Sequence, residues 1–146
     1  MDFDLEQYSK QIINQYSGLF DTIKSICNDL INNPNSTDIN KYYRYQDQLT
    51  GIYGSLNVAY KQLSALKKNK EAEYYNLLKL QADANNEKFV SAVAEKESSK
   101  YVAPLRTARD ILEGYVEVVV KTIDTCRSHI YEYKKDQKYD VWHRDI

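Results

Sequence analysis

The sequence predicts an all-α protein, built as a long helical hairpin or coiled-coil-like bundle that is completed by oligomerisation. Three observations indicate this fold class. The 146 residues include only four Gly and two Pro, so turns are few and helices are long. Hydrophobic residues recur at steps of three and four over long stretches, which is the spacing of one helix face. One such stretch runs for roughly 40 residues, and a helix of that length favours packing between copies of the chain.

The first predicted helix covers residues 4–32. Its hydrophobic positions step by three or four throughout and are Leu5, Tyr8, Ile12, Tyr16, Leu19, Ile23, Ile26 and Leu30. Residues 32–37, with the sequence Asn-Asn-Pro-Asn-Ser-Thr, then favour a turn. Thr37 or Asp38 can cap the helix that follows, because their side-chain oxygens accept hydrogen bonds from free amide groups.

The second predicted helix covers residues 38–82. Its hydrophobic seam contains Ile39, Tyr42, Tyr45, Leu49, Ile52, Leu56, Ala59, Leu63 and Leu66, and continues through Tyr74, Leu77 and Leu78. The segment from Asp83 to Asn86 is the weakest helical stretch in the middle of the chain and is a candidate turn. A short third helix is expected over residues 87–96, where Phe89, Val90 and Val93 are apolar.

The last predicted helix covers residues 98–138. Its seam contains Tyr101, Leu105, Ala108, Leu112, Tyr115, Val119, Ile123, Cys126, Ile130 and Tyr133, and one added step of four interrupts the heptads. Pro104 is tolerated in a first helical turn but would kink a helix that began much earlier. Residues 139–146 have no period, so we expect a tail that is either loose or docked through Trp142. Residues 1–138 are therefore predicted to form a single all-helical domain.

The sequence contains no recognisable motif for catalysis or cofactor binding. Neither of the two histidines, His129 and His143, belongs to a Glu-x-x-His or His-Glu-x-x-His metal-binding motif. There is no glycine-rich phosphate loop, dinucleotide fingerprint or Gly-x-Ser-x-Gly motif. Cys27 and Cys126 lie far apart, as expected of two reduced cysteines. We therefore expect a protein that is not an enzyme and that uses no cofactor and no metal.

The expected location is the cytoplasm. The first residues are acidic and lack the basic and apolar regions of a signal peptide, and no apolar run is long enough to span a membrane. Asn, Lys, Tyr and Ile are abundant, a bias that AT-rich codons produce and that fits an AT-rich bacterium or a phage. For a phage-encoded protein, this location would be the host cytoplasm.

Charge is distributed unevenly along a chain whose formal net charge is only −1. Residues 41–70 hold six Lys and Arg against Asp47 alone, a net charge of +5, and they are rich in tyrosine. Lysines that follow phosphates, beside rings on which bases can stack, suit single-stranded nucleic acid. The candidate nucleic-acid-binding residues are Lys61, Lys67, Lys68, Lys70, Tyr74, Tyr75 and Lys79. The alternatives are that these lysines form an ordinary solvated surface and that the tyrosines on the seam belong to the core.

The chain also resembles a known family over about residues 39–133. One stretch that carries the resemblance runs from Ile52 to Tyr60, into the lysine cluster and on to Asn76-Leu-Leu-Lys79. The other runs from Phe89 to Val102, and it is followed by Ile111, Leu112, Tyr115, Ile123 and Ile130. Both are similar to the UvsY-type recombination mediators of T-even and related phages. In that family a Lys-x-Arg pair is associated with DNA binding, and here Lys79 matches the first position while Gln81 stands at the second.

The resemblance implies a non-enzymatic homo-oligomer of helical hairpins that binds single-stranded DNA. It further implies that the protein helps to load a RecA-like recombinase onto strands coated by single-strand-binding protein, so these two proteins would be partners, without a membrane. Two other functions remain open from the sequence. One is a coiled-coil adaptor or phage assembly protein without nucleic-acid binding, and the other is a small inhibitor of a host enzyme.

Overall fold

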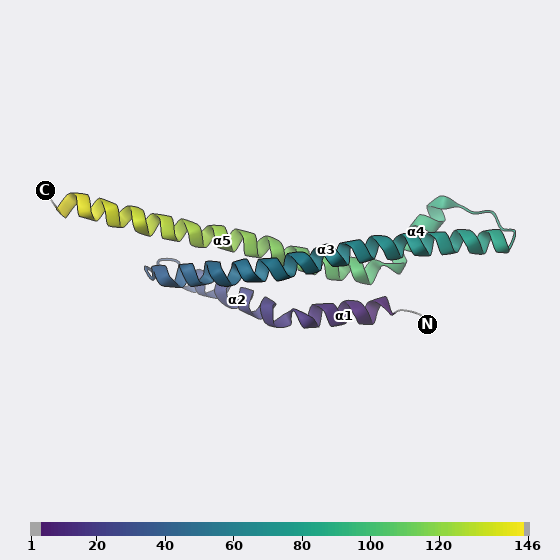
Figure 1. The fold of residues 1–146 in the computed structure, drawn as a ribbon, viewed down its shortest axis with the longest axis horizontal. Coiled ribbons are helices and arrows are strands. Elements are labelled where there is room, and N and C mark those ends of the chain that lie inside the picture. Colours follow the sequence, from purple (N-terminus) through teal and green to yellow (C-terminus); the bar gives the residue numbers. More distant parts are fainter. Residues whose placement is uncertain (1–3, 145–146) are drawn as a thin grey trace. The chain divides into compact units, whose positions relative to one another are not determined.

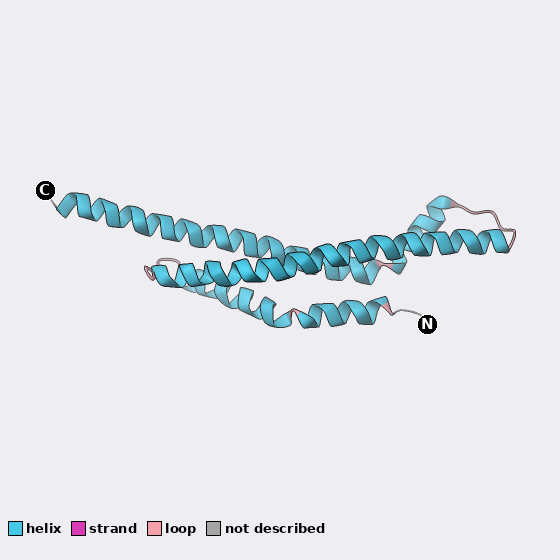
Figure 2. Ribbon diagram, viewed as in Figure 1, coloured by secondary structure: helices cyan, strands magenta, loops and turns pink. Residues whose placement is uncertain are grey.

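The computed structural model describes residues 4–144, and this part of the chain contains five helices and no strand (Figures 1 and 2). The helices are α1 (Leu5–Gln15), α2 (Ser17–Asn32), α3 (Ile39–Ala84), α4 (Ser91–Tyr101) and α5 (Ala103–Arg144). The all-α prediction is confirmed. The two longest helices, α3 and α5, contain 46 and 42 residues. Within residues 4–144 no helix is both long and apolar enough to cross a membrane.

The described chain separates into two compact units, and α3 and α5 each contribute residues to both. Unit 1 contains residues 4–15 and Val58–Glu113, and unit 2 contains Tyr16–Asn57 and residues 114–144. Each unit is described by itself below, and the single domain over residues 1–138 stays a prediction.

The core of unit 1 is made where α1, the second part of α3, α4 and the start of α5 bury one face each. Its buried residues are Leu5, Ser9, Ala59, Leu63, Ala94, Ser98, Val102, Leu105, Ala108 and Leu112. Ser98 is tolerated in this core because its hydroxyl donates a hydrogen bond to the Ala94 carbonyl oxygen at 2.7 Å. The seam residues expected on the last helix from Leu105 to Leu112 are therefore core residues.

The core of unit 2 is made by α2, the first part of α3 and the remainder of α5. Its buried residues are Phe20, Ile23, Ile26, Tyr42, Leu49, Ile52, Leu56, Val119, Thr122, Cys126 and Ile130. The Phe20 ring stacks on the Tyr115 ring with 4.0 Å between centroids, and the Tyr42 ring stacks on His129 at 4.6 Å. The predicted seams thus supply most of this core, and Phe20 adds a buried position that the sequence did not predict.

The first predicted helix, residues 4–32, is wrong as a single element because it is broken at Tyr16. The backbone of Tyr16 leaves the helical region, with φ −100° and ψ 3°. Its carbonyl oxygen accepts hydrogen bonds from the amides of Leu19 and Phe20, at 3.0 and 3.1 Å, and so starts a new helix. Hydrophobic spacing alone could not reveal this break, because the steps of three and four continue across it.

The second predicted helix is confirmed with small shifts at its ends. Asp38 caps α3 as expected, since its carboxylate accepts a hydrogen bond from the Lys41 amide at 3.2 Å. The helix continues to Ala84, two residues beyond the predicted end, and the turn then uses Asn86 with φ 54°. Asn adopts this left-handed conformation more readily than most residues, because its short polar side chain makes local hydrogen bonds.

The boundaries predicted for residues 87–96 and 98–138 are wrong. The chain is not helical from 87 to 90, and Val90 is extended, so α4 begins at Ser91 and continues to Tyr101. The break at Val102, with φ −94° and ψ 7°, comes two residues before Pro104. Because Pro104 has no amide hydrogen and restricts the residue before it, a helix starts there more easily than it continues through.

The predicted tail, residues 139–146, is also wrong over its described part. Residues 139–144 continue α5, and residues 145 and 146 lie outside the described residues. The Tyr139 ring stacks on His143 one turn later, with 3.8 Å between centroids, which supports the helical conformation. Trp142 is 76% exposed, so it does not dock on the rest of the described chain.

Candidate nucleic-acid interface

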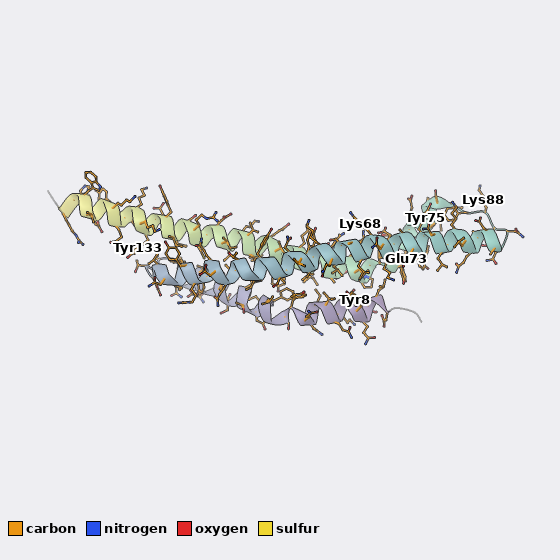
Figure 3. The ribbon with its side chains drawn as sticks, viewed as in Figure 1. Tyr8, Lys68, Glu73, Tyr75, Lys88 and Tyr133 are labelled. Atoms are coloured by element: carbon orange, nitrogen blue, oxygen red, sulfur yellow. The ribbon has the colours of Figure 1, made fainter. Side chains whose placement is uncertain are left out.

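The seven candidate nucleic-acid-binding residues all lie on α3 in unit 1, but they fall on different sides of the helix. Figure 3 labels Lys68, Glu73 and Tyr75 along this part of α3. Three of the lysines, Lys61, Lys68 and Lys79, are exposed. The other four candidates are partly buried, and each of them contacts another side chain of the same unit.

Two of the lysines are paired with acids on their own helix. The Lys67 ammonium lies 3.1 Å from a Glu71 carboxylate oxygen, and the Lys70 ammonium lies 3.3 Å from a Glu73 carboxylate oxygen. The Lys67 side chain is only 16% exposed. A phosphate would have to compete with these carboxylates, so neither lysine offers a full positive charge to a nucleic acid.

The two tyrosines face other rings. Tyr74 stacks on Tyr101 with 4.4 Å between centroids, and Tyr75 meets Phe89 edge-on at 5.5 Å. These contacts attach α4 and the segment before it to α3. For either tyrosine to stack on a base, it would first have to leave its present aromatic partner.

Ion pairs with acids outside residues 41–70 therefore reduce the net charge of +5 that this segment carries along the sequence. Lys41, the third lysine of this block with an acidic partner, lies 3.1 Å from an Asp29 carboxylate oxygen in unit 2. None of the three neutralising acids belongs to residues 41–70, since Glu71 and Glu73 follow this segment directly and Asp29 lies twelve residues before it. The net charge summed over residues 41–70 could not include these acids. Side chains three or four residues apart in a helix, or on neighbouring helices, contact each other even when only one of them belongs to the segment that is summed.

The three exposed lysines remain, and they form one stripe, which we call the lysine stripe (Lys61, Lys68 and Lys79). With 3.6 residues per turn, Lys61 and Lys79 are about five turns apart on the same side of α3, and Lys68 lies within about 20° of them. The buried residues Ala59 and Leu63 lie on the opposite side of the helix. The stripe is about 27 Å long at 1.5 Å per residue. Among the described residues no acid lies within ion-pair distance of its three ammonium groups.

A small hollow beside the stripe contains acidic groups. It has a volume of about 360 Å³ and is lined by Lys68, Glu71, Ala72, Tyr75, Asn76, Glu95 and Ser98. Glu71 and Glu95 give it negative charge, so it is unsuited to a phosphate. A nucleic acid bound by the stripe would therefore lie on the outer side of α3.

A second concave surface of unit 1 is apolar and was not predicted from the sequence. This groove has a volume of about 560 Å³ and lies between α1 and the start of α5, with Ile13, Pro104 and Ile111 among its lining residues. The buried Ser9 hydroxyl also lines it and has no hydrogen-bond partner. The groove has no cluster of titratable groups for catalysis, and its chemistry suits an apolar side chain of a protein partner.

The groups with shifted pKa values lie in unit 2 and are structural. The Asp29 carboxylate accepts a hydrogen bond from the Tyr45 hydroxyl at 2.7 Å and from the Asn33 amide at 2.8 Å. Hydrogen bonds from Tyr45 and Lys41 lower the pKa of Asp29, whereas burial, together with the bond to Asp29, raises the pKa of Tyr45 to about 12. This cluster joins α2 to α3.

The two cysteines are free thiols. Burial, with a smaller contribution from Cys27, raises the pKa of Cys126 to about 11, so this thiol is a poor nucleophile at neutral pH. The Cys27 sulfur contacts the Thr122 hydroxyl oxygen at 3.7 Å and forms no disulfide with Cys126. Within residues 4–144 no group of three or more His, Cys, Asp or Glu side chains could hold a metal ion.

Comparison of the chain with protein-family models, with curated proteins and with solved structures finds no match.

Proposed function

We propose that this protein is a non-enzymatic recombination mediator that binds single-stranded DNA through the lysine stripe of α3. In this role it would help to load a RecA-like recombinase onto strands coated by single-strand-binding protein, in the cytoplasm or, for a phage protein, in the host cytoplasm. The observation that carries the proposal is the alignment of Lys61, Lys68 and Lys79 on one exposed side of α3, away from its buried side. The resemblance of residues 39–133 to UvsY-type mediators supports the choice of partners.

The arrangement is better suited to binding a flexible single strand than to reading the groove of a duplex. The three ammonium groups are spread over about 27 Å, a length over which an extended strand presents many phosphates. Lysine is a compact charge without the planar fork that reads base edges, so binding should depend on backbone charge and show little sequence preference.

The test is a titration of fluorescently labelled single-stranded and duplex oligonucleotides, followed by anisotropy at several salt concentrations. The lysine-stripe variant replaces Lys61, Lys68 and Lys79 by Ala, and the control variant replaces Lys88, Lys96 and Lys100 of the same unit, which removes the same charge from exposed positions outside α3. We expect the stripe variant to reduce the slope of log affinity against log salt by about 2, at ~0.7 per phosphate contact. We expect a clearly smaller change from the control variant. Equal changes in both variants, or no binding of the unaltered protein at the lowest salt, would overturn the proposal.

The apolar groove of unit 1 favours a second candidate function, that of a coiled-coil adaptor or phage assembly protein without nucleic-acid binding. Ile13 and Ile111 give the groove an apolar lining on a surface that a polar monomer would not need. If this function is correct, Ile13→Asp should lower the oligomer mass measured by light scattering, and added DNA should leave the mass of the unaltered protein unchanged. A DNA-dependent change of mass would instead favour the mediator.

A further inference from the structure

The end of α5, which lies in unit 2, carries a face rich in basic and aromatic residues. We call it the basic-aromatic face. Its seven members follow the spacing of one helix face, i, i+3, i+4, i+7, i+8, i+11 and i+12, and are Tyr131, Lys134, Lys135, Lys138, Tyr139, Trp142 and His143. All seven are exposed.

Three acidic residues of this helical segment lie at one edge of this face or beyond it. Glu132, Asp136 and Asp140 follow each other at steps of four, about 100° to 180° around the helix from Tyr131. Glu132 therefore lies at the edge of the face, beside Tyr139 and His143. The four central members of the face fall within about 60° of one another and about 60° or more from the nearest acid, and they are Tyr131, Lys135, Lys138 and Trp142. A solvated helix end with mixed charges has no need of this separation.

Large rings on this face are left open to solvent. Trp142 is 76% exposed, Tyr131 is 65% exposed and Tyr139 is 61% exposed. Some members contact each other or the neighbouring helix, since Tyr139 stacks on His143 and the Lys134 ammonium lies 5.5 Å from the centre of the Tyr43 ring. Those contacts fix part of the face, while Tyr131, Lys135, Lys138 and Trp142 are directed to solvent along about 16 Å of helix.

We propose that the basic-aromatic face is a second binding surface for single-stranded nucleic acid, in addition to the lysine stripe. Bases stack on the Trp142 and Tyr131 rings, and Lys135 and Lys138 contact the phosphates between them. Every base has a flat π-face, so such a surface binds strands with little sequence preference. A duplex is excluded because its bases are already stacked on each other. The inference rests on the proposed function, which it extends to unit 2.

The composition of the face favours a nucleic acid over a lipid surface. A helix that lies in a membrane interface buries a broad aliphatic or Phe-rich face. None of the seven members of the basic-aromatic face is aliphatic, and six of them are Lys, Tyr or His, whose side chains end in polar groups. Rings with polar ends beside cations match bases and phosphates.

The test uses Trp142, the only tryptophan in the chain, as a local probe. Stacking of a base on the indole quenches its fluorescence, so titration with oligothymidylate at low salt should quench Trp142, and added salt should restore the emission. We expect Lys135→Ala with Lys138→Ala to weaken the midpoint of quenching about tenfold at low salt, as the loss of two phosphate contacts requires. Lys121→Ala, an exposed lysine of α5 outside the face, serves as the control and should change the midpoint by much less.

The outcomes separate this inference from the proposed function. Oligonucleotide binding seen by anisotropy without any quenching of Trp142 would overturn the inference while leaving the lysine stripe in place. Quenching that persists in the lysine-stripe variant would support the face as an independent surface, and absence of both signals would overturn both proposals. A blue shift of Trp142 with phosphatidylserine-containing vesicles, and none of these effects with oligothymidylate, would assign the face to a membrane and overturn it as a nucleic-acid surface. Circular dichroism of each variant checks that the exposed substitutions leave the helices intact.

Discussion

Tyr42 and Tyr43 are neighbours on α3 and allow the packing of unit 2 to be tested with a matched pair of substitutions. Tyr42 is 2% exposed and belongs to a cluster with Cys126 and Ile130. Its ring stacks on His129, and its hydroxyl donates a hydrogen bond to the Ser36 carbonyl oxygen at 3.1 Å. Tyr43 is 40% exposed, and its ring has one notable contact, the Lys134 ammonium at 5.5 Å.

Replacing each tyrosine by Ala should therefore have very different effects on the free energy of unfolding. For Tyr42→Ala we expect a loss of about 3–5 kcal/mol from the removed ring and the cavity it leaves, with the hydrogen bond contributing ~1 kcal/mol of that range. For Tyr43→Ala we expect a loss of about 0.5–1 kcal/mol, the value of an exposed cation–π contact. The gain in helix propensity on changing Tyr to Ala is the same at both positions, so it cancels in the comparison.

Urea unfolding followed by far-ultraviolet circular dichroism measures the difference. With an m-value of about 2 kcal/mol/M, the Tyr42→Ala midpoint should fall by roughly 2 M and the Tyr43→Ala midpoint by less than about 0.5 M. Tyr42→Phe isolates the hydroxyl and should cost ~1 kcal/mol. Equal midpoints for the two Ala variants would refute the packing of α3 against α5 in unit 2, because the argument depends entirely on which ring is buried.

Three further predictions concern single groups. Since the folded state lowers the pKa of Asp29 below its ordinary value of 3.8, the stability that this carboxylate contributes is present above that value and is lost as the pH falls through the folded pKa. Asp29→Asn should therefore cost about 1 kcal/mol at pH 7 and progressively less in acid, as urea midpoints at pH 7, 4 and 3 would show; a cost that does not change with pH would contradict this. Because burial raises the pKa of Cys126 to about 11, a thiol reagent at pH 8 should modify Cys27 first in the native protein and Cys126 only after unfolding. Mass spectrometry of the labelled peptides measures the order of modification, and modification of Cys126 before Cys27 would contradict this prediction. Asn86 has φ 54°, so Asn86→Gly should be nearly neutral while Asn86→Val should cost about 1–2 kcal/mol in thermal or urea unfolding, and equal stability of the two variants would rule out the left-handed turn.

The seams of the long helices could be predicted from the sequence because burial of apolar side chains imposes the helical period directly on the residue order. Leu49, Leu56, Leu105 and Leu112 were all expected on seams, and each is 0% exposed. The ends and breaks of the helices were harder to predict from the sequence. At Tyr16 the hydrophobic steps continue while the backbone leaves the helix, and at residues 87–90 the packing of Phe89 on Tyr75 accompanies a non-helical backbone.

The end of α5 shows how a missed period conceals a surface. We expected residues 139–146 to lack regular structure because the hydrophobic seam ends near Tyr133. The helix continues to Arg144, and the residues that then repeat at helical spacing are basic and aromatic instead of aliphatic. Counting Lys, Tyr, Trp and His together at i, i+3 and i+4 from Tyr131 would have found the basic-aromatic face.

The sequence by itself determined the helical class, the long seams and the absence of recognisable catalytic motifs, since these depend on composition and on spacing within one helix. Only the tertiary structure decided which charges and rings remain available for a partner. Lys67 and Lys70 meet Glu71 and Glu73, and Tyr74 meets Tyr101, whereas the lysine stripe stays exposed. The physical reason is that the availability of a charge or ring depends on its neighbours in space, including those on other helices, and the order of residues along the chain does not specify them.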